Sequence, residues 1–183
     1  MILWLIGGLI IILVLIAVYY INTIIVLSNR INNASSQINV QLKKRADLVP
    51  NLVETVKGYV KHEKNIMTNV TKAREKMLGA GNLKEKIKAN GELTKALKTI
   101  FALTENYPNL KANENFKLLQ EQLEGIENKI AYSRQFYNDS VLRFNNIITT
   151  IPGIWFAGII GKNKQHEYFK ITEEEKKPVN VKF

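Results

Sequence analysis

The sequence predicts an all-α protein in which an N-terminal transmembrane helix is followed by an antiparallel, up-and-down four-helix bundle. Three observations support this fold. Residues 2–21 contain no charged side chain and, as a helix, are long enough to cross about 30 Å of hydrocarbon. The apolar residues that follow recur at spacings of three and four, which is the repeat of one helix face. Clusters of glycine, proline and asparagine separate these helical stretches.

The apolar run indicates an uncleaved membrane span. A secretory signal would have a basic start, a shorter apolar core and a small-residue cleavage site, and none is present here. Tyr19 and Tyr20 at the end of the run suit the aromatic belt of a bilayer. A buried core helix is disfavoured, because a helix that is apolar all round has no wet face in so small a domain. The first charged side chain is Arg30, so the positive-inside rule favours an N-terminus outside and a cytoplasmic domain.

After the span, the same helix continues with an apolar stripe made of Ile24, Leu27, Ile31, Ala34, Ile38 and Leu42. We predict a reversal of the chain near residues 47–50. Pro50 is poor inside a helix but suits its first turn, and Asp47 is placed as a nearby cap. An unbroken rod from Ile24 to Met77 would extend about 80 Å, which no later helix is long enough to cover. The second helix then carries Leu52, Val56, Tyr59, Ile66, Val70, Ala73 and Met77.

Two further helices complete the predicted bundle. The glycine-rich residues 79–82 end the second helix, and Asn82 and Glu85 have the spacing of a capping box for the third. The fourth helix has apolar residues close to a 3.5 repeat from Phe116 to Phe144, as in a coiled coil. We therefore divide the chain into a transmembrane anchor (1–23), a helix-bundle domain (24–150), and an apolar segment with a charged C-terminal tail (151–183).

The sequence contains no arrangement of residues that predicts a reaction. Cysteine is absent, and neither His62 nor His166 has metal-ligand spacing around it. We therefore predict no catalytic residue, no metal site and no cofactor. The formal charge of +10 invites a nucleic-acid or anionic-lipid interpretation. Nucleic acid is disfavoured because the lysines are scattered over several helices and no recognised module is present.

Two groups of residues are candidate sites. The first is a polar network of residues near the core stripes, for which a role in helix register is favoured over a binding site. Its members are Arg45, Asn51, Glu54, Arg134, Asn138 and Asp139. The second is the apolar segment 151–160, which is too short to span a bilayer but contains Ile154, Trp155 and Phe156. We expect it either to contact the membrane interface or to cover the end of the bundle.

Several stretches of the chain resemble the signature of the LemA family. These are Asn29-Arg30, Asn33-Ala34, residues 37–59 (QINVQLKKRADLVPNLVETVKGY), 107–116 (YPNLKANENF), 123–132 (LEGIENKIAY) and 134–139 (RQFYND). The resemblance implies a bacterial single-span membrane protein with an antiparallel helix bundle, in a family without a settled biochemical activity. Ser35, Asn39 and Phe144 depart from the tryptophan, aspartate and tyrosine that the family often has. Asn39 weakens the case for an aspartate in a polar network.

These observations favour a non-enzymatic, membrane-anchored bundle that acts as a scaffold or interaction module of the bacterial cell membrane. Its expected partners are the lipid bilayer, through residues 2–21, and a protein of unknown identity. A polyanion- or lipid-binding module is the first alternative, and salt-sensitive binding would distinguish it. An unrecognised enzyme is the second alternative, which a deep pocket lined by Arg134, Asn138, Asp139 and His62 would support.

Overall fold

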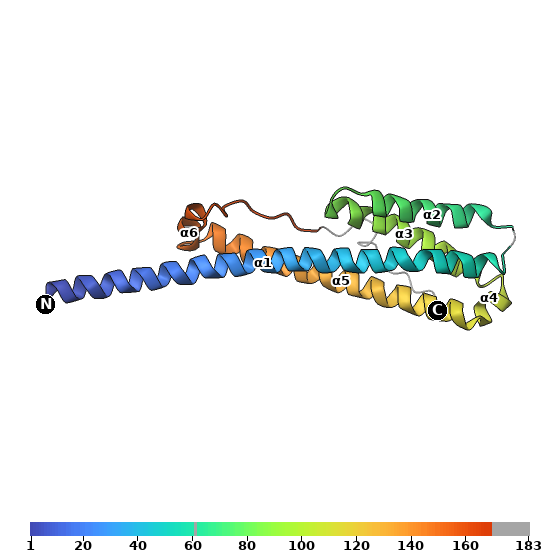
Figure 1. The fold of residues 1–183 in the computed structure, drawn as a ribbon, viewed down its shortest axis with the longest axis horizontal. Helices are drawn as coiled ribbons and strands as arrows, with labels where there is room; N and C mark the ends of the chain where they lie inside the picture. Colours follow the sequence, from blue (N-terminus) through green and yellow to red (C-terminus); the bar gives the residue numbers. More distant parts are fainter. Residues whose placement is uncertain (61, 170–183) are drawn as a thin grey trace, which may run out of the picture. The chain divides into compact units, whose positions relative to one another are not determined.

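The computed structural model describes residues 1–60 and 62–169, and within them the chain forms helices without β-strands (Figure 1). The helices are α1 (Ile2–Lys57), α2 (Lys64–Gly79), α3 (Leu83–Leu103), α4 (Pro108–Ala112), α5 (Glu114–Thr149) and α6 (Gly153–Ile159). The all-α prediction and the long apolar N-terminal helix are confirmed. The finer prediction, an up-and-down bundle of four helices, stays a prediction.

The contacts divide the chain into two compact units. Unit 1 contains residues 1–34 together with the chain from residue 134 onward, and unit 2 contains residues 35–133. Helices α1 and α5 each contribute to both units. The predicted domain boundaries after residues 23 and 150 stay predictions. Residues 170–183 of the predicted charged tail lie outside the described residues.

The predicted reversal near residues 47–50 is wrong. Helix α1 continues through Pro50 to Lys57, and the next helix, α2, begins at Lys64. The apolar stripe assigned to the second helix is therefore shared between two helices. Leu52 and Val56 are buried on α1, whereas Val70 and Met77 are buried on α2.

A hydrogen bond from α2 explains why Pro50 does not end α1. Proline has no N–H, so it leaves the carbonyl four residues earlier, that of Ala46, without its helical donor. The Nε of Arg74, on α2, donates to this carbonyl oxygen at 2.7 Å. A side chain from the neighbouring helix thus satisfies the acceptor that the proline exposes.

The predicted cap of α3 is confirmed. The Asn82 side chain accepts a hydrogen bond from the Glu85 backbone N–H at 2.9 Å. The Glu85 carboxylate reaches back to the Gly81 N–H at 3.1 Å, one residue before the position of a standard capping box. At the start of α5, Asn113 accepts from the Phe116 N–H and donates to the Tyr59 hydroxyl, each at 2.8 Å.

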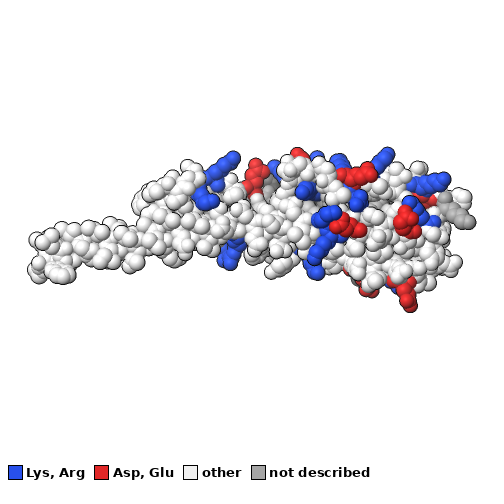
Figure 2. Space-filling model, in the orientation of Figure 1, with Lys and Arg blue, Asp and Glu red and all other residues white. Residues whose placement is uncertain are grey.

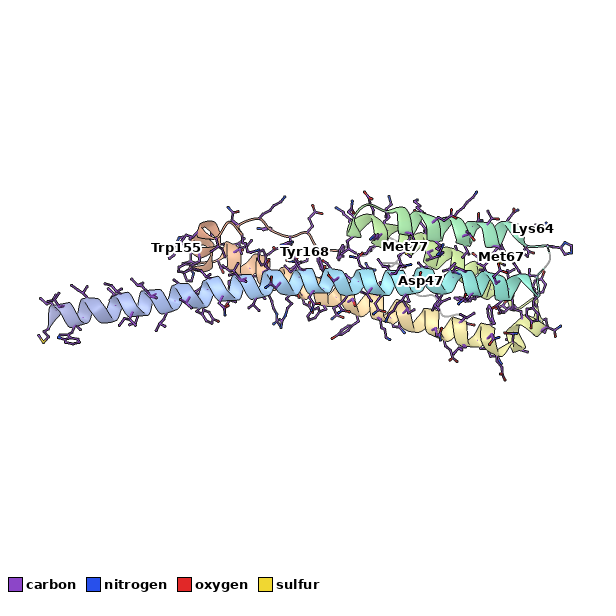
Figure 3. All side chains as sticks on the ribbon, in the orientation of Figure 1. Asp47, Lys64, Met67, Met77, Trp155 and Tyr168 are labelled. Atoms are coloured by element: carbon purple, nitrogen blue, oxygen red, sulfur yellow. The ribbon has the colours of Figure 1, made fainter. Side chains whose placement is uncertain are left out.

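Each unit has its own apolar core. In unit 2 the core combines residues of α1 to α5, including Leu42, Leu52, Val70, Met77, Leu93, Leu97, Leu110, Phe116 and Leu123. In unit 1 it combines the α1 residues Ile24 and Ile31 with Tyr137, Val141, Phe144 and Ile148 of α5. The labelled Met67 and Met77 show the face of α2 that contributes to the core of unit 2 (Figure 3). The apolar stripes predicted from the sequence therefore contribute to the cores of both units.

The Arg74 contact predicts a coupling between two distant substitutions. Arg74→Ala should lower the free energy of unfolding by about 1–3 kcal/mol, because the Ala46 carbonyl loses its donor. In a Pro50→Ala background, the restored N–H of residue 50 supplies that donor, so the same Arg74→Ala change should cost clearly less. Urea unfolding of the four proteins of this double-mutant cycle measures the difference. Equal costs in the two backgrounds would contradict the explanation.

Candidate functional sites

Arg45 is a buried cation that links three helices of unit 2. Its side chain is only 4% exposed. Its Nη1 donates to the Asn90 side-chain oxygen at 2.6 Å and to the Thr94 hydroxyl at 2.9 Å, both on α3. The same nitrogen forms an ion pair with the Glu127 carboxylate of α5. Burial lowers the pKa of Arg45, and the Glu127 charge opposes this effect.

A small cavity of about 180 Å³ lies beside this guanidinium. Its lining includes Arg45, Lys98, Phe101, Glu124 and Glu127. Arg45 Nε and Glu127 Oε2 have no hydrogen-bond partner among the described residues, although Oε2 is within ion-pair distance of Nη1. Because the Arg45 guanidinium is bonded to α3 and paired with Glu127 of α5 within unit 2, we assign Arg45 a structural role in fixing helix register.

The structure distributes the predicted polar network over both units. Of the unit 2 members, Asn51 is exposed and Glu54 pairs with Lys57 at 2.7 Å. Arg134, Asn138 and Asp139 belong to unit 1, so their grouping with Arg45 stays a prediction. The partners that Arg45 does have in the structure are absent from the sequence prediction. Asn90 and Thr94 were detectable, because they occupy positions of the apolar stripe of α3 where a core residue is expected.

Helix α6 is held against α1 at the end of the apolar run. The Phe156 ring stacks on the Tyr20 ring, with centroids 5.8 Å apart and planes at 20°. Ala157 is fully buried. Gly153 permits the tight entry from α5, since a Cβ there would overlap the Ile147 carbonyl oxygen. Beyond α6, the Lys162 ammonium donates to the Ser28 hydroxyl of α1 at 2.9 Å.

The other face of α6 and its flank expose large apolar side chains. Trp155 is 61% exposed, Ile151 74% and Ile159 76%, and Ile154 is also exposed. Trp155 is labelled on α6 in Figure 3. The predicted trio is therefore divided, because Phe156 packs on α1 whereas Ile154 and Trp155 face outward. Packing on α1 accounts for one face only, and contact of the other face with a membrane stays a prediction.

Residues 162–169, which we call the C-terminal strap, lie along α5 without forming a helix or strand. The Asn145 side chain donates to the His166 carbonyl at 2.9 Å and accepts from the His166 N–H at 3.0 Å. Asn138 makes the same pair of bonds with Phe169, both at 2.9 Å. Asn138, a member of the predicted polar network, thus binds main chain in the structure, and its grouping with the other members stays a prediction. Tyr168, labelled in Figure 3, marks the strap.

Ring contacts accompany these bonds. The ring centroids of Phe169 and Tyr137 are 4.4 Å apart, and those of His166 and Phe144 are 5.0 Å apart. Burial, reinforced by the Glu167 charge, raises the pKa of Tyr137. Burial also lowers the pKa of His166, with further contributions from the positive charges of Lys162 and Lys164. The docked strap therefore favours the neutral imidazole.

The structure also bears on metal binding and membrane insertion. Within the described residues, no three His, Asp or Glu side chains are grouped as a metal site would require. Among the helices of residues 1–60 and 62–169, α1 is the one whose length and apolar composition suffice to cross a bilayer. Figure 2 shows its N-terminal part free of charged side chains.

The Arg45 contact generates a stability prediction. Glu127→Gln removes the charge that compensates the buried guanidinium. We expect a loss of about 1–3 kcal/mol in the free energy of unfolding, below the value for a fully buried pair because the Glu127 side chain is 39% exposed. Glu124→Gln, on the same helix and at the same cavity, is the matched control and should cost less than about 0.5 kcal/mol. Urea unfolding measures both. Equal losses would remove the special role of Glu127.

The strap generates a pH prediction. Because the folded pKa of His166 lies below its ordinary 6.5, docking is favoured above about pH 6.5 and weakens as the pH falls through the lowered value. In a His62→Gln chain, His166 is the one histidine left, and its imidazole proton shifts can be titrated by NMR. The midpoint should lie below 6.5 and return toward 6.5 when Asn145→Ala is added. A midpoint at or above 6.5 in the first protein would contradict the docked geometry.

The amino-acid sequence of the chain matches a known protein family and several relatives. The model of the LemA family matches residues 34–183. The chain is 26% identical over 175 residues to the magnetosome proteins MamQ 1 and MamQ 2 of Paramagnetospirillum magneticum, covering 81% of this chain and 64% of each relative. It is also 26% identical over 160 residues to magnetosome protein MamQ of Magnetospirillum gryphiswaldense, covering 73% of this chain and 58% of that protein. The chain thus spans less than two thirds of the length of these relatives. Because the family model matches most of its length, the chain belongs to the LemA family.

Proposed function

We propose that this protein is a non-enzymatic, membrane-anchored helical protein that presents its surface to a protein partner. The observation that carries the proposal is the uncovered apolar start of α1. Leu3, Leu9, Leu15 and other large apolar side chains of residues 2–16 are exposed, so the described chain itself does not cover them. Exposing so much contiguous apolar surface to water is unfavourable, and a bilayer removes the cost.

Helix α6 extends the proposed membrane contact. The stacked Tyr20 and Phe156 rings set α6 beside the end of the apolar run, where an aromatic belt would lie. The outward face with Trp155, Ile151 and Ile159 then meets the interface between headgroups and hydrocarbon. A short apolar helix cannot span the bilayer but can lie in this layer. In this arrangement unit 1 is held to the bilayer at two places, the span and α6.

The surface of unit 2 supports an interaction role. A groove of about 480 Å³ between α1 and α5 has apolar walls from Leu48 and Ile126 and polar edges that include Lys44 and Lys129. Tyr132 is 71% exposed, and aromatic side chains are enriched where proteins bind one another. The two lysines and the net charge of +10 also favour the alternative of a polyanion-binding module. Binding that falls steeply with added salt would select that alternative.

The membrane contact predicts how the two tryptophans respond to lipid. In the 183-residue chain reconstituted into vesicles, a Trp4→Phe variant reports on Trp155 alone. We expect lipids brominated near the headgroups to quench Trp155, because an interfacial ring lies within contact of that layer. A Trp155→Phe chain, which retains Trp4 in the apolar run, is the positive control for insertion. Quenching of Trp4 without quenching of Trp155, together with full access of Trp155 to aqueous iodide, would remove α6 from the membrane contact.

A further inference from the structure

The strap is bound to α5 mainly through its backbone. Asn138 and Asn145 each offer one N–H donor and one oxygen acceptor to a single strap residue, and each makes both bonds. This is the pairing that a residue on a neighbouring antiparallel strand would make. Because it uses only N–H and C=O groups, it places no demand on the strap's side chains.

The spacing of the two asparagines matches the repeat of an extended chain. Seven residues along a helix rise about 10.5 Å and return nearly to the same face. Phe169 and His166 are three residues apart, which is about 9–10 Å in an extended chain, and a chain with three residues per turn presents both to one side. Asn138 pairs with the later strap residue and Asn145 with the earlier one, so the strap runs antiparallel to α5.

Two buried aromatic rings next to the asparagines supply side-chain selectivity. Tyr137, beside Asn138, contacts the Phe169 ring and donates a hydrogen bond to the Glu167 carbonyl at 3.3 Å. Phe144, beside Asn145, contacts the His166 ring edge to face. Backbone pairing combined with contacts for side chains at a fixed spacing is how proteins recognise extended peptides. The α5 face therefore has the parts of a recognition site.

We propose that the face of α5 from Tyr137 to Asn145 is an extended-peptide site, which the chain's own strap occupies in this structure. Its ligand is a peptide segment with two ring side chains three residues apart, supplied by a protein partner. This inference rests on the proposed function and specifies the kind of partner segment. The strap is then an internal competitor, present at an effective concentration of about millimolar because it is covalently tethered. A partner binds by displacing it.

A labelled peptide with the sequence of residues 163–169, NKQHEYF, tests the site in the 183-residue chain in detergent. His166→Ala with Phe169→Ala removes the competing rings, and peptide affinity by fluorescence anisotropy should rise by at least about tenfold over the unchanged chain. Adding Asn138→Ala and Asn145→Ala should abolish binding. Adding Asn146→Ala instead, at the exposed neighbouring asparagine, should leave binding unchanged. The peptide NKQAEYA should not bind.

Hydrogen exchange in the unchanged chain gives an independent measurement. The amides of His166 and Phe169 are the donors to Asn145 and Asn138, so excess NKQHEYF peptide should accelerate exchange at both. Asn138→Ala with Asn145→Ala should do the same without peptide, whereas Asn146→Ala should not. Absence of peptide binding and of accelerated exchange would overturn the site. Quenching of Trp155 by brominated lipid would in that case leave the proposed membrane function standing.

Discussion

The hydrogen bond from Arg74 to the Ala46 carbonyl is the contact on which the course of α1 depends. A proline in a helix interior removes one hydrogen bond and crowds the preceding carbonyl, and the combined cost is about 3 kcal/mol. Here the exposed carbonyl has a donor from α2 at 2.7 Å, so the helix continues for seven more residues. Because α1 is continuous, one element supplies the apolar run, the α1 part of the unit 1 core and the α1 part of the unit 2 core. A break at Pro50 would separate Leu52 and Val56 from the stripe to which they belong.

Arg45, the residue immediately before Ala46, also links α1 to neighbouring helices through polar contacts. The side chain of Arg45 and the backbone carbonyl of Ala46 together connect α1 with α2, α3 and α5. A buried guanidinium is costly unless its donors are used and its charge is compensated. Asn90 and Thr94 use the donors of Nη1, and Glu127 compensates the charge. Such directional contacts restrict how helices slide and rotate against one another, which apolar stripes alone do only weakly.

Unit 1 combines two kinds of surface that are unusual for a protein in water. Helix α6 uses its small and aromatic residues Gly153, Phe156 and Ala157 for contact within the unit, and it leaves Trp155 with its isoleucine neighbours outside. The α5 face beyond it binds an extended segment through asparagine side chains. The first surface suits lipid and the second suits polypeptide. Together they support the proposals that the protein is held at a bilayer and recognises another polypeptide there.

The sequence alone determined the all-α class, the apolar N-terminal helix, the Asn82 cap and most of the core stripes. These features depend on local periodicity and on residues three or four apart, which a single helix displays without knowledge of its neighbours. Only the tertiary structure decided that α1 passes Pro50, because the donor for Ala46 comes from a residue 28 positions away. The same holds for Asn90 and Thr94, the hydrogen-bond acceptors of Arg45, which lie 45 and 49 positions along the chain. Asn138 and Asn145 bind backbone groups 31 and 21 residues later, and only the folded chain brings these together. A backbone amide has no signature in the residue types that carry it, so its pairing appears only once the chain is folded.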